Sequence, residues 1–192
     1  MIILIGGASH IGKTYLAQRL MEKLKITYLS LDHIKMGLIR GGIADGFSVA
    51  DKDEVISEKM WPVIDGIIRT NIENEQNIII EGYYLPQKQV KELKEEYIGV
   101  IWEMYICFSK QYIIENFEEQ ILKNRSVIER RLYEEENSAE DFVENNQKVL
   151  QACEENELKY YVISEKYEEN MDRVVEYFDK VCKKSLGQLC IE

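Results

Sequence analysis

A glycine-rich stretch near the start of the sequence has the residue types and spacing of a phosphate-binding loop. Gly7 and Gly12 are separated by four residues and are followed by Lys13 and Thr14, which fits the pattern G-x-x-x-x-G-K-[ST]. Glycines let several backbone N–H groups turn toward one anion, and a following helix adds partial positive charge. The motif therefore predicts a nucleotide-binding loop formed by Gly7, Ala8, Ser9, His10, Ile11, Gly12, Lys13 and Thr14.

The last two residues of the motif have distinct predicted roles. Lys13 can place positive charge on the β- and γ-phosphates of ATP, and Thr14 can place a hydroxyl on a Mg²⁺ ion between them. The apolar run 1–5 predicts a buried parallel strand before the loop, and apolar residues at helical spacing predict a helix over 13–25. The alternative is a glycine-rich turn without a ligand, which leaves Lys13 and Thr14 unexplained.

Hydrophobic patterning predicts strands alternating with helices along the whole chain. Strands are expected over 1–5, 26–31, 77–81, 99–108 and 159–163. Helices are expected over 13–25, 33–39, 51–59, 63–72, 86–96, 109–123, 138–155 and 168–184. Asp51 and Glu54 resemble a capping box, and Pro62 is expected either to kink that helix or to start a new one. This order predicts an α/β fold with a doubly wound, five-stranded parallel sheet and helices on both faces.

Two acidic residues follow predicted strands, at the edge of such a sheet where ligands bind. Asp32 could orient an attacking hydroxyl or accept its proton, or it could cap the next helix, and one residue can do both. Glu81 follows three isoleucines and could hold Mg²⁺ or accept a hydrogen bond from a substrate, because a buried carboxylate needs a partner. A solvated strand end is the alternative for Glu81. Tyr83 could line a substrate pocket or belong to the core.

Three arginines form the clearest basic cluster in this acidic chain. Arg125, Arg130 and Arg131 could close over the phosphates, neutralise charge in the transition state and exclude water. The alternative is a salt-bridged surface helix, because glutamates lie close by in the sequence. Lys35 and Arg40 follow Asp32 and could bind an anionic substrate.

Composition limits the classes of function. The 192 residues fit one domain, and the net charge of −11 argues against nucleic acid as a partner. No apolar run approaches the ~20 residues of a membrane-spanning helix, and the first strand is not a signal peptide, so we expect a cytoplasmic protein. The four cysteines show no metal-binding spacing and are expected to be reduced thiols: Cys107, Cys153, Cys182 and Cys190.

Together these segments resemble the small P-loop kinases, a group that includes adenylate kinase, shikimate kinase, chloramphenicol phosphotransferases and zeta-toxin kinases. The resemblance is closest to bacterial adenylate-kinase-like proteins. Its motifs are residues 6–14, 29–35 and 78–84 and the arginine segment after the fourth strand. It implies one P-loop domain over 1–192 built as a three-layer sandwich, with a helical lid at about 111–137 and an adenine-reading loop at 164–167. It also implies that Asp32 contacts the acceptor hydroxyl.

The sequence as a whole predicts an ATP- and Mg²⁺-dependent phosphotransferase with a small-molecule acceptor. The acceptor is either a nucleoside or nucleotide, or a hydroxylated metabolite, sugar or antibiotic. Two alternatives stay open: a nucleotide-binding regulatory module with slow hydrolysis, and a toxin-like kinase that a partner protein holds inactive. The sequence predicts neither the acceptor nor the oligomeric state.

Overall fold

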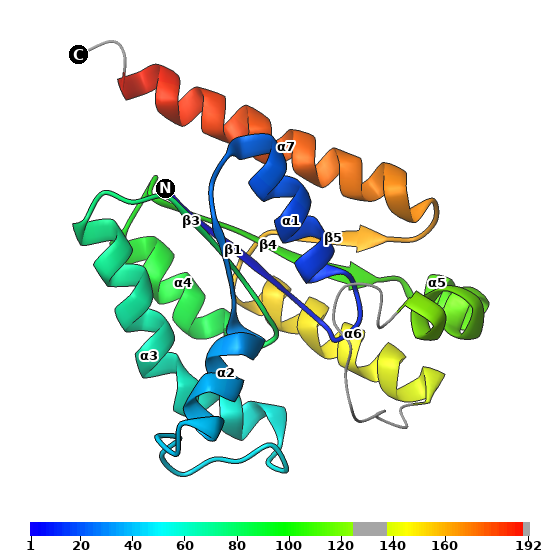
Figure 1. Cartoon of the computed structure of the whole chain (residues 1–192). Coiled ribbons are helices and arrows are strands. Elements are labelled where there is room, and N and C mark those ends of the chain that lie inside the picture. The colour runs from blue at the N-terminus through cyan, green and yellow to red at the C-terminus, as the bar shows by residue number, and fades with distance from the viewer. Residues whose placement is uncertain (125–137, 190–192) are drawn as a thin grey trace.

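A computed structural model describes residues 1–124 and 138–189 of the chain (Figure 1). In this part of the chain, the strands are β1 (Ile2–Gly7), β2 (Tyr28–Ser30), β3 (Ile78–Glu81), β4 (Ile101–Phe108) and β5 (Tyr160–Ile163). They form one sheet in the order β2-β3-β1-β4-β5, and all neighbouring strands are parallel. The predicted α/β fold with a five-stranded parallel sheet is therefore confirmed.

Helices cover both faces of the sheet. They are α1 (Lys13–Leu24), α2 (Leu31–Arg40), α3 (Asp53–Glu73), α4 (Gln87–Glu96), α5 (Lys110–Asn116), α6 (Ala139–Glu155) and α7 (Tyr167–Leu189), with a π-helical segment η1 (Phe117–Leu122) directly after α5. Figure 1 shows α1 and α7 packed together on one face, and α3, α4 and α6 on the other. This arrangement is the predicted three-layer sandwich.

The central strand β1 explains why its sequence is apolar throughout. Ile2 pairs with Ile78 of β3 on one side and with Ile101 of β4 on the other, and the residues from Ile2 to Ile5 are fully buried. A strand with neighbours on both edges and helices on both faces has no side that faces water. The hydrophobic run therefore fixes β1 in the middle of the core, and the loop that follows it emerges at the middle of the sheet edge.

The second strand ends earlier than predicted. Ser30 is its last residue, and Leu31 already begins α2. Asp32 is therefore not the helix cap that the sequence suggested, but lies in the first turn of α2, where the helix dipole favours a negative charge. Leu31 is buried, so the first turn of α2 packs into the core.

The long helix α3 also differs from the prediction. It runs from Asp53 to Glu73 without a break, and Pro62 lies inside it on the exposed side, where water can bind the carbonyl that loses its partner. Asp51 does not cap this helix, because its carboxylate accepts hydrogen bonds from the backbone and hydroxyl of Ser48 at 2.7 and 2.9 Å.

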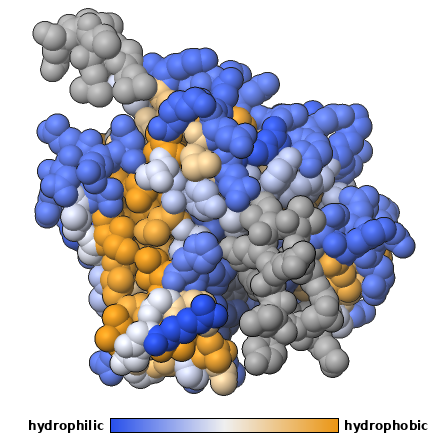
Figure 2. Space-filling view, viewed as in Figure 1, coloured by the Kyte–Doolittle hydropathy of each residue, from blue (hydrophilic) through white to orange (hydrophobic). Residues whose placement is uncertain are grey.

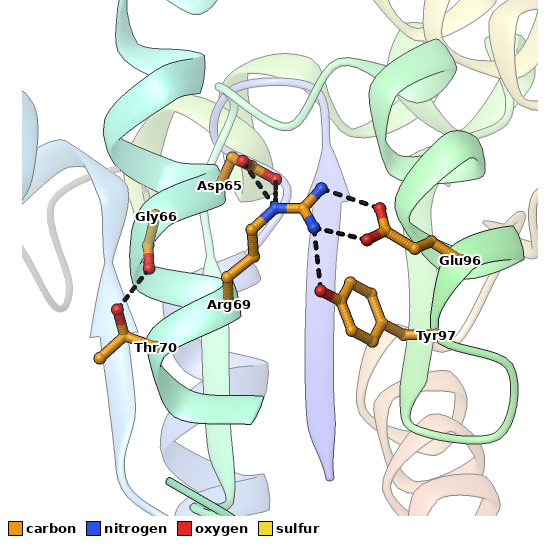
Figure 3. A network of polar contacts seen from close by, with 6 residues as sticks. All are labelled: Asp65, Gly66, Arg69, Thr70, Glu96 and Tyr97. Carbon is orange, nitrogen blue, oxygen red and sulfur yellow. Dashed lines mark hydrogen bonds and ion pairs between the residues drawn. The ribbon is translucent and has the colours of Figure 1, made fainter. Parts of the chain in front are cut away.

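Arg69 links the C-terminal part of α3 to the C-terminal end of α4 through polar contacts (Figure 3). Its Nε donates to both carboxylate oxygens of Asp65, at 3.0 and 2.9 Å. The rest of the guanidinium donates to Glu96 at 2.6 and 2.9 Å and to the Tyr97 hydroxyl at 2.9 Å. Because one planar group binds two helices, the network holds the second half of α3 in place.

The surface is mostly hydrophilic on the face that Figure 2 shows, with an apolar area on the side of α2 and α3. Several large, exposed apolar side chains belong to α3 and to the segment between α2 and α3: Ile43, Val49, Val55 and Val63. None of the described helices combines the length and the apolar character that crossing a membrane requires.

Candidate nucleotide and acceptor site

The glycine-rich loop lies between β1 and α1, in the strand–loop–helix context that the motif predicts. Gly7 and Gly12 have positive φ angles of 139° and 89°. A Cβ on Gly7 would lie 2.3 Å from the Ile106 carbonyl oxygen, and a Cβ on Gly12 would lie 1.8 Å from the Tyr167 hydroxyl oxygen. Both positions therefore need glycine for its backbone conformation and for space.

Lys13 is the first residue of α1, and its ammonium folds back over the loop. The Nζ atom donates a hydrogen bond of 2.7 Å to the carbonyl oxygen of Ala8. Burial raises the pKa values of Glu81 and Cys107, and the nearby positive charge of Lys13 acts in the opposite direction. The structure thus places the Lys13 charge between the loop and the ends of β3 and β4.

Glu81 and Thr14 form the most informative pair of the site. The Thr14 hydroxyl donates to Oε1 of Glu81 at 3.1 Å, although 67 residues separate the two in the sequence. Glu81 is buried at the end of β3, and burial raises its pKa, while a hydrogen bond to Ser30 and the charge of Lys13 act in the opposite direction. A hydroxyl and a carboxylate side by side are oxygen ligands of the kind that Mg²⁺ prefers.

Thr14 and Glu81 also suit a metal ion that a bound nucleotide helps to coordinate. In the described part of the chain, no group of three or more His, Cys, Asp or Glu side chains could hold a metal ion by itself. Mg²⁺ commonly binds one or two protein side chains and completes its shell with phosphate oxygens and water. The pair of Thr14 and Glu81 beside the phosphate loop matches that pattern.

A second polar cluster lies after β2, next to the first. Nζ of Lys35 lies 3.2 Å from the Asp32 carboxylate and donates to the Tyr84 hydroxyl at 2.7 Å. The Tyr84 hydroxyl in turn donates to Asp53 of α3 at 3.3 Å. The negative charge of Asp32 raises the pKa of Glu81, so the two carboxylates are within electrostatic reach of each other. The structure therefore brings Asp32, Lys35 and Glu81 together.

The other two residues expected to bind substrate have different positions. Tyr83 is half-buried and packs edge-on against Tyr84, with ring centroids 5.8 Å apart. Burial and the nearby carboxylates of Asp53 and Glu54 raise its pKa to about 12. Arg40 is the exposed last residue of α2, about 12 Å along the helix axis from Asp32 at 1.5 Å per residue. The structure does not bring Arg40 into the cluster.

The expected lid lies partly outside the described residues. Arg125, Arg130 and Arg131 belong to the segment 125–137, which the structure does not describe. The earlier part, 111–124, is helical and buries Tyr112, Ile113 and Ile121. Ser109 caps this helix by accepting a hydrogen bond from the Tyr112 backbone at 3.1 Å.

Two contacts around the phosphate loop were not predicted from the sequence. His10, which has a positive φ of 57°, stacks on Phe142 of α6 with ring centroids 5.8 Å apart. The Tyr167 hydroxyl donates to the Ile11 carbonyl at 3.4 Å, and its ring stacks on Tyr15 at 6.3 Å. No local pattern points to these aromatic residues, because they reach the loop from more than a hundred positions away. Tyr167 also brings the expected adenine-reading segment 164–167 next to the loop.

The three cysteines in the described part of the chain are buried thiols. Cys107, Cys153 and Cys182 are free, in agreement with the prediction, whereas Cys190 lies outside the described residues. Burial raises the pKa of the Cys107 thiol to about 12. A thiol with such a pKa stays protonated near neutral pH and is a poor nucleophile.

No protein-family model matches the sequence, and no curated protein matches it either. Solved structures do match the fold. A proposed kinase from Chloroflexus aurantiacus has 17% identity and a TM-score of 0.59, covering 93% of this chain and 96% of its own. Shikimate kinase from Bacteroides thetaiotaomicron has 15% identity and a TM-score of 0.52, covering 93% and 98%.

A third structure extends the comparison to a kinase of nucleosides. Deoxyadenosine kinase from M. mycoides has 11% identity and a TM-score of 0.54, and the match covers 94% of this chain and 100% of that one. At such low identities the likeness concerns the fold. The chain has the fold of the P-loop small-molecule kinases.

Proposed function

We propose that this protein transfers the γ-phosphoryl group of ATP to a hydroxyl group of a small molecule, in a reaction that needs Mg²⁺. The observation that carries the proposal is the meeting of three segments at one edge of the sheet. Thr14 of the phosphate loop hydrogen-bonds to Glu81 at the end of β3, and the charges of Lys13 and of Asp32 at the start of α2 act on the same carboxylate. These are the groups that phosphoryl transfer requires.

In the proposed reaction each residue has a defined task. The loop amides and Lys13 bind the phosphates, and Thr14 and Glu81 hold the metal ion, which supplies positive charge to the transferred group when it is bound. Asp32 orients the acceptor hydroxyl and accepts its proton. The arginines at 125, 130 and 131 are proposed to neutralise further phosphate charge.

The acceptor is proposed at the level of its reacting group only. Structures with this fold include enzymes named for shikimate and for deoxyadenosine, so the fold accommodates acceptors of different chemistry. A carboxylate such as Asp32 suits an acceptor hydroxyl. Both classes, nucleosides and hydroxylated metabolites, therefore enter the test.

The test is ADP release from ATP and Mg²⁺, with and without pools of nucleosides, nucleoside monophosphates, sugars, hydroxy acids and amino sugars. We expect one pool to raise the rate, and Lys13→Ala to abolish the increase. Asp32→Asn is expected to lower it by about 10²- to 10⁴-fold, the contribution typical of general acid–base catalysis. Lys88→Met, a change of an exposed lysine on α4, serves as the control.

Two further measurements decide the outcome. Chelation of Mg²⁺ with EDTA is expected to stop transfer in the wild type. Binding of ATP to Asp32→Asn, measured by calorimetry, is expected to match the wild type, because Asp32 belongs to the acceptor side. Unchanged transfer by Lys13→Ala would refute the proposed function. ATP binding without transfer to any pool would favour the regulatory or partner-controlled alternatives.

A further inference from the structure

Lys35 lies where its positive charge contacts the Asp32 carboxylate. The two side chains are one helical turn apart on α2, and Nζ of Lys35 lies 3.2 Å from Oδ1 of Asp32. The side chains are only 17% and 29% exposed, so the pair is less screened by water than a surface ion pair. The lysine thereby restricts the directions in which the Asp32 carboxylate can point.

Tyr84 holds Lys35 in this position from the other side. The Tyr84 hydroxyl accepts a hydrogen bond of 2.7 Å from Nζ, and the same nitrogen lies 4.8 Å from the centre of the Tyr84 ring. Tyr84 is itself 3% exposed, and its hydroxyl donates to Asp53 of α3 at 3.3 Å. The segment after β3 and the helix α3 thus fix the lysine, and the lysine fixes the aspartate.

These contacts use most of the binding capacity of the ammonium group. Lysine has three N–H donors and no acceptor. The ammonium group donates one hydrogen bond to the Tyr84 hydroxyl, and it also contacts the Asp32 carboxylate. An acceptor phosphate at Lys35 would have to compete with this carboxylate for the same charge.

On the basis of the proposed function, we infer that Lys35 is a positioning residue for Asp32 and not an anchor for an anionic acceptor, and that Tyr84 holds it there. The part of the acceptor that binds beside Asp32 therefore carries an uncharged hydroxyl group. It has no phosphate or carboxylate that Lys35 must bind. This assigns Lys35 a role different from the anion-binding one suggested by its charge in the sequence.

Steady-state kinetics separate the two roles. Loss of a positioning residue lowers kcat, because the bound acceptor is no longer oriented for reaction, whereas loss of an anchor raises KM for the acceptor and leaves kcat in place. We expect Lys35→Met to lower kcat by about tenfold to a hundredfold, as misplacement of a reacting group does. KM for ATP is expected to stay at the wild-type value, because Lys35 lies on the acceptor side.

Two milder variants test the chain of contacts and guard against a folding defect in Lys35→Met. Lys35→Arg keeps the positive charge beside Asp32 and is expected to recover most of kcat. Tyr84→Phe keeps the ring and removes the hydroxyl, and is expected to lower kcat by less than Lys35→Met. Lys88→Met is the control, and thermal melting shows that each variant is folded.

The acceptors are tested in pairs that differ by one phosphate, such as adenosine with AMP and glucose with glucose 6-phosphate. We expect the uncharged member of the productive pair to be phosphorylated with the higher kcat/KM. Two outcomes would overturn this inference: a wild-type kcat with a raised acceptor KM in Lys35→Met, or a preference for the phosphorylated member of the pair. If Lys13→Ala is inactive at the same time, the proposed function still stands. Activity in Lys13→Ala would overturn both.

Discussion

A single methyl group on Gly12 tests how tightly the phosphate loop is built. Gly12 has a φ of 89°, which costs an alanine about 1–2 kcal/mol in the left-handed region. The added Cβ would also lie 1.8 Å from the Tyr167 hydroxyl oxygen, and relief of such an overlap costs about 1–3 kcal/mol. We therefore expect Gly12→Ala to lower the free energy of unfolding by about 2–5 kcal/mol.

A second substitution separates the two causes. Tyr167→Phe removes the hydroxyl oxygen that the new Cβ would meet, while the ring carbon next to it would still lie 3.1 Å away. The double variant Gly12→Ala/Tyr167→Phe is therefore expected to regain about 1–2 kcal/mol relative to Gly12→Ala, and the backbone cost remains. Tyr167→Phe alone loses a hydrogen bond to the Ile11 carbonyl and is expected to cost about 0.5–1.5 kcal/mol.

The assay is urea unfolding of the four proteins, followed by circular dichroism and analysed as a double-mutant cycle. Thermal melting is a second measure, with an expected shift of about 4–20 °C for Gly12→Ala at roughly 2–4 °C per kcal/mol in a protein of this size. A double variant that is no more stable than Gly12→Ala would refute the steric argument. Stability of Gly12→Ala within about 0.5 kcal/mol of the wild type would refute both arguments.

Two further predictions concern titratable groups. The Cys107 thiol is buried and its pKa is raised to about 12, so we expect iodoacetamide at pH 8 to leave it unmodified until denaturant is added. Peptide mass mapping measures the modification, and rapid labelling of the native protein would contradict the prediction. The hydrogen bond from Arg69 lowers the pKa of Glu96 below its ordinary value of 4.5, so its stabilisation is present above pH 4.5 and is lost as the pH falls through the lowered pKa. Urea unfolding should therefore find Glu96→Gln less stable than the wild type at pH 7, with a difference that shrinks as the pH falls below 4.5. Glu92→Gln is the control, and a difference independent of pH would contradict the role of Arg69.

The fold was predictable because its signals are local. Largely apolar strands and the helical spacing after the loop both appear as short patterns in the sequence. The rule that parallel strands end at one edge then placed Asp32 and Glu81 near the phosphate loop. The contact between Thr14 and Glu81 agrees with that placement.

The remaining features depend on contacts that no short pattern records. The sequence predicts an anion-binding role for Lys35, and only the folded chain shows that Asp32 and Tyr84 contact its ammonium group. The sequence predicts that Pro62 either kinks a helix or starts a new one, and α3 continues through it at an exposed position. His10 found its partner Phe142 across the fold. The contacts of Lys35 with Tyr84 and of His10 with Phe142 join segments that packing, and not sequence proximity, brings together.

The position of β1 in the middle of the sheet has a consequence for how the protein reaches its folded state. Ile2 lies between Ile78 and Ile101, and the loop after β1 is closed by Tyr167, 156 positions from Ile11. Folding must close these long loops before contacts repay the lost chain entropy, so we expect it to be slow compared with a helical bundle. Until then the run from Ile2 to Ile5 is an exposed, uncharged segment with high β-propensity. The stretch that creates the phosphate site is thus also one at which a newly made chain can associate with another.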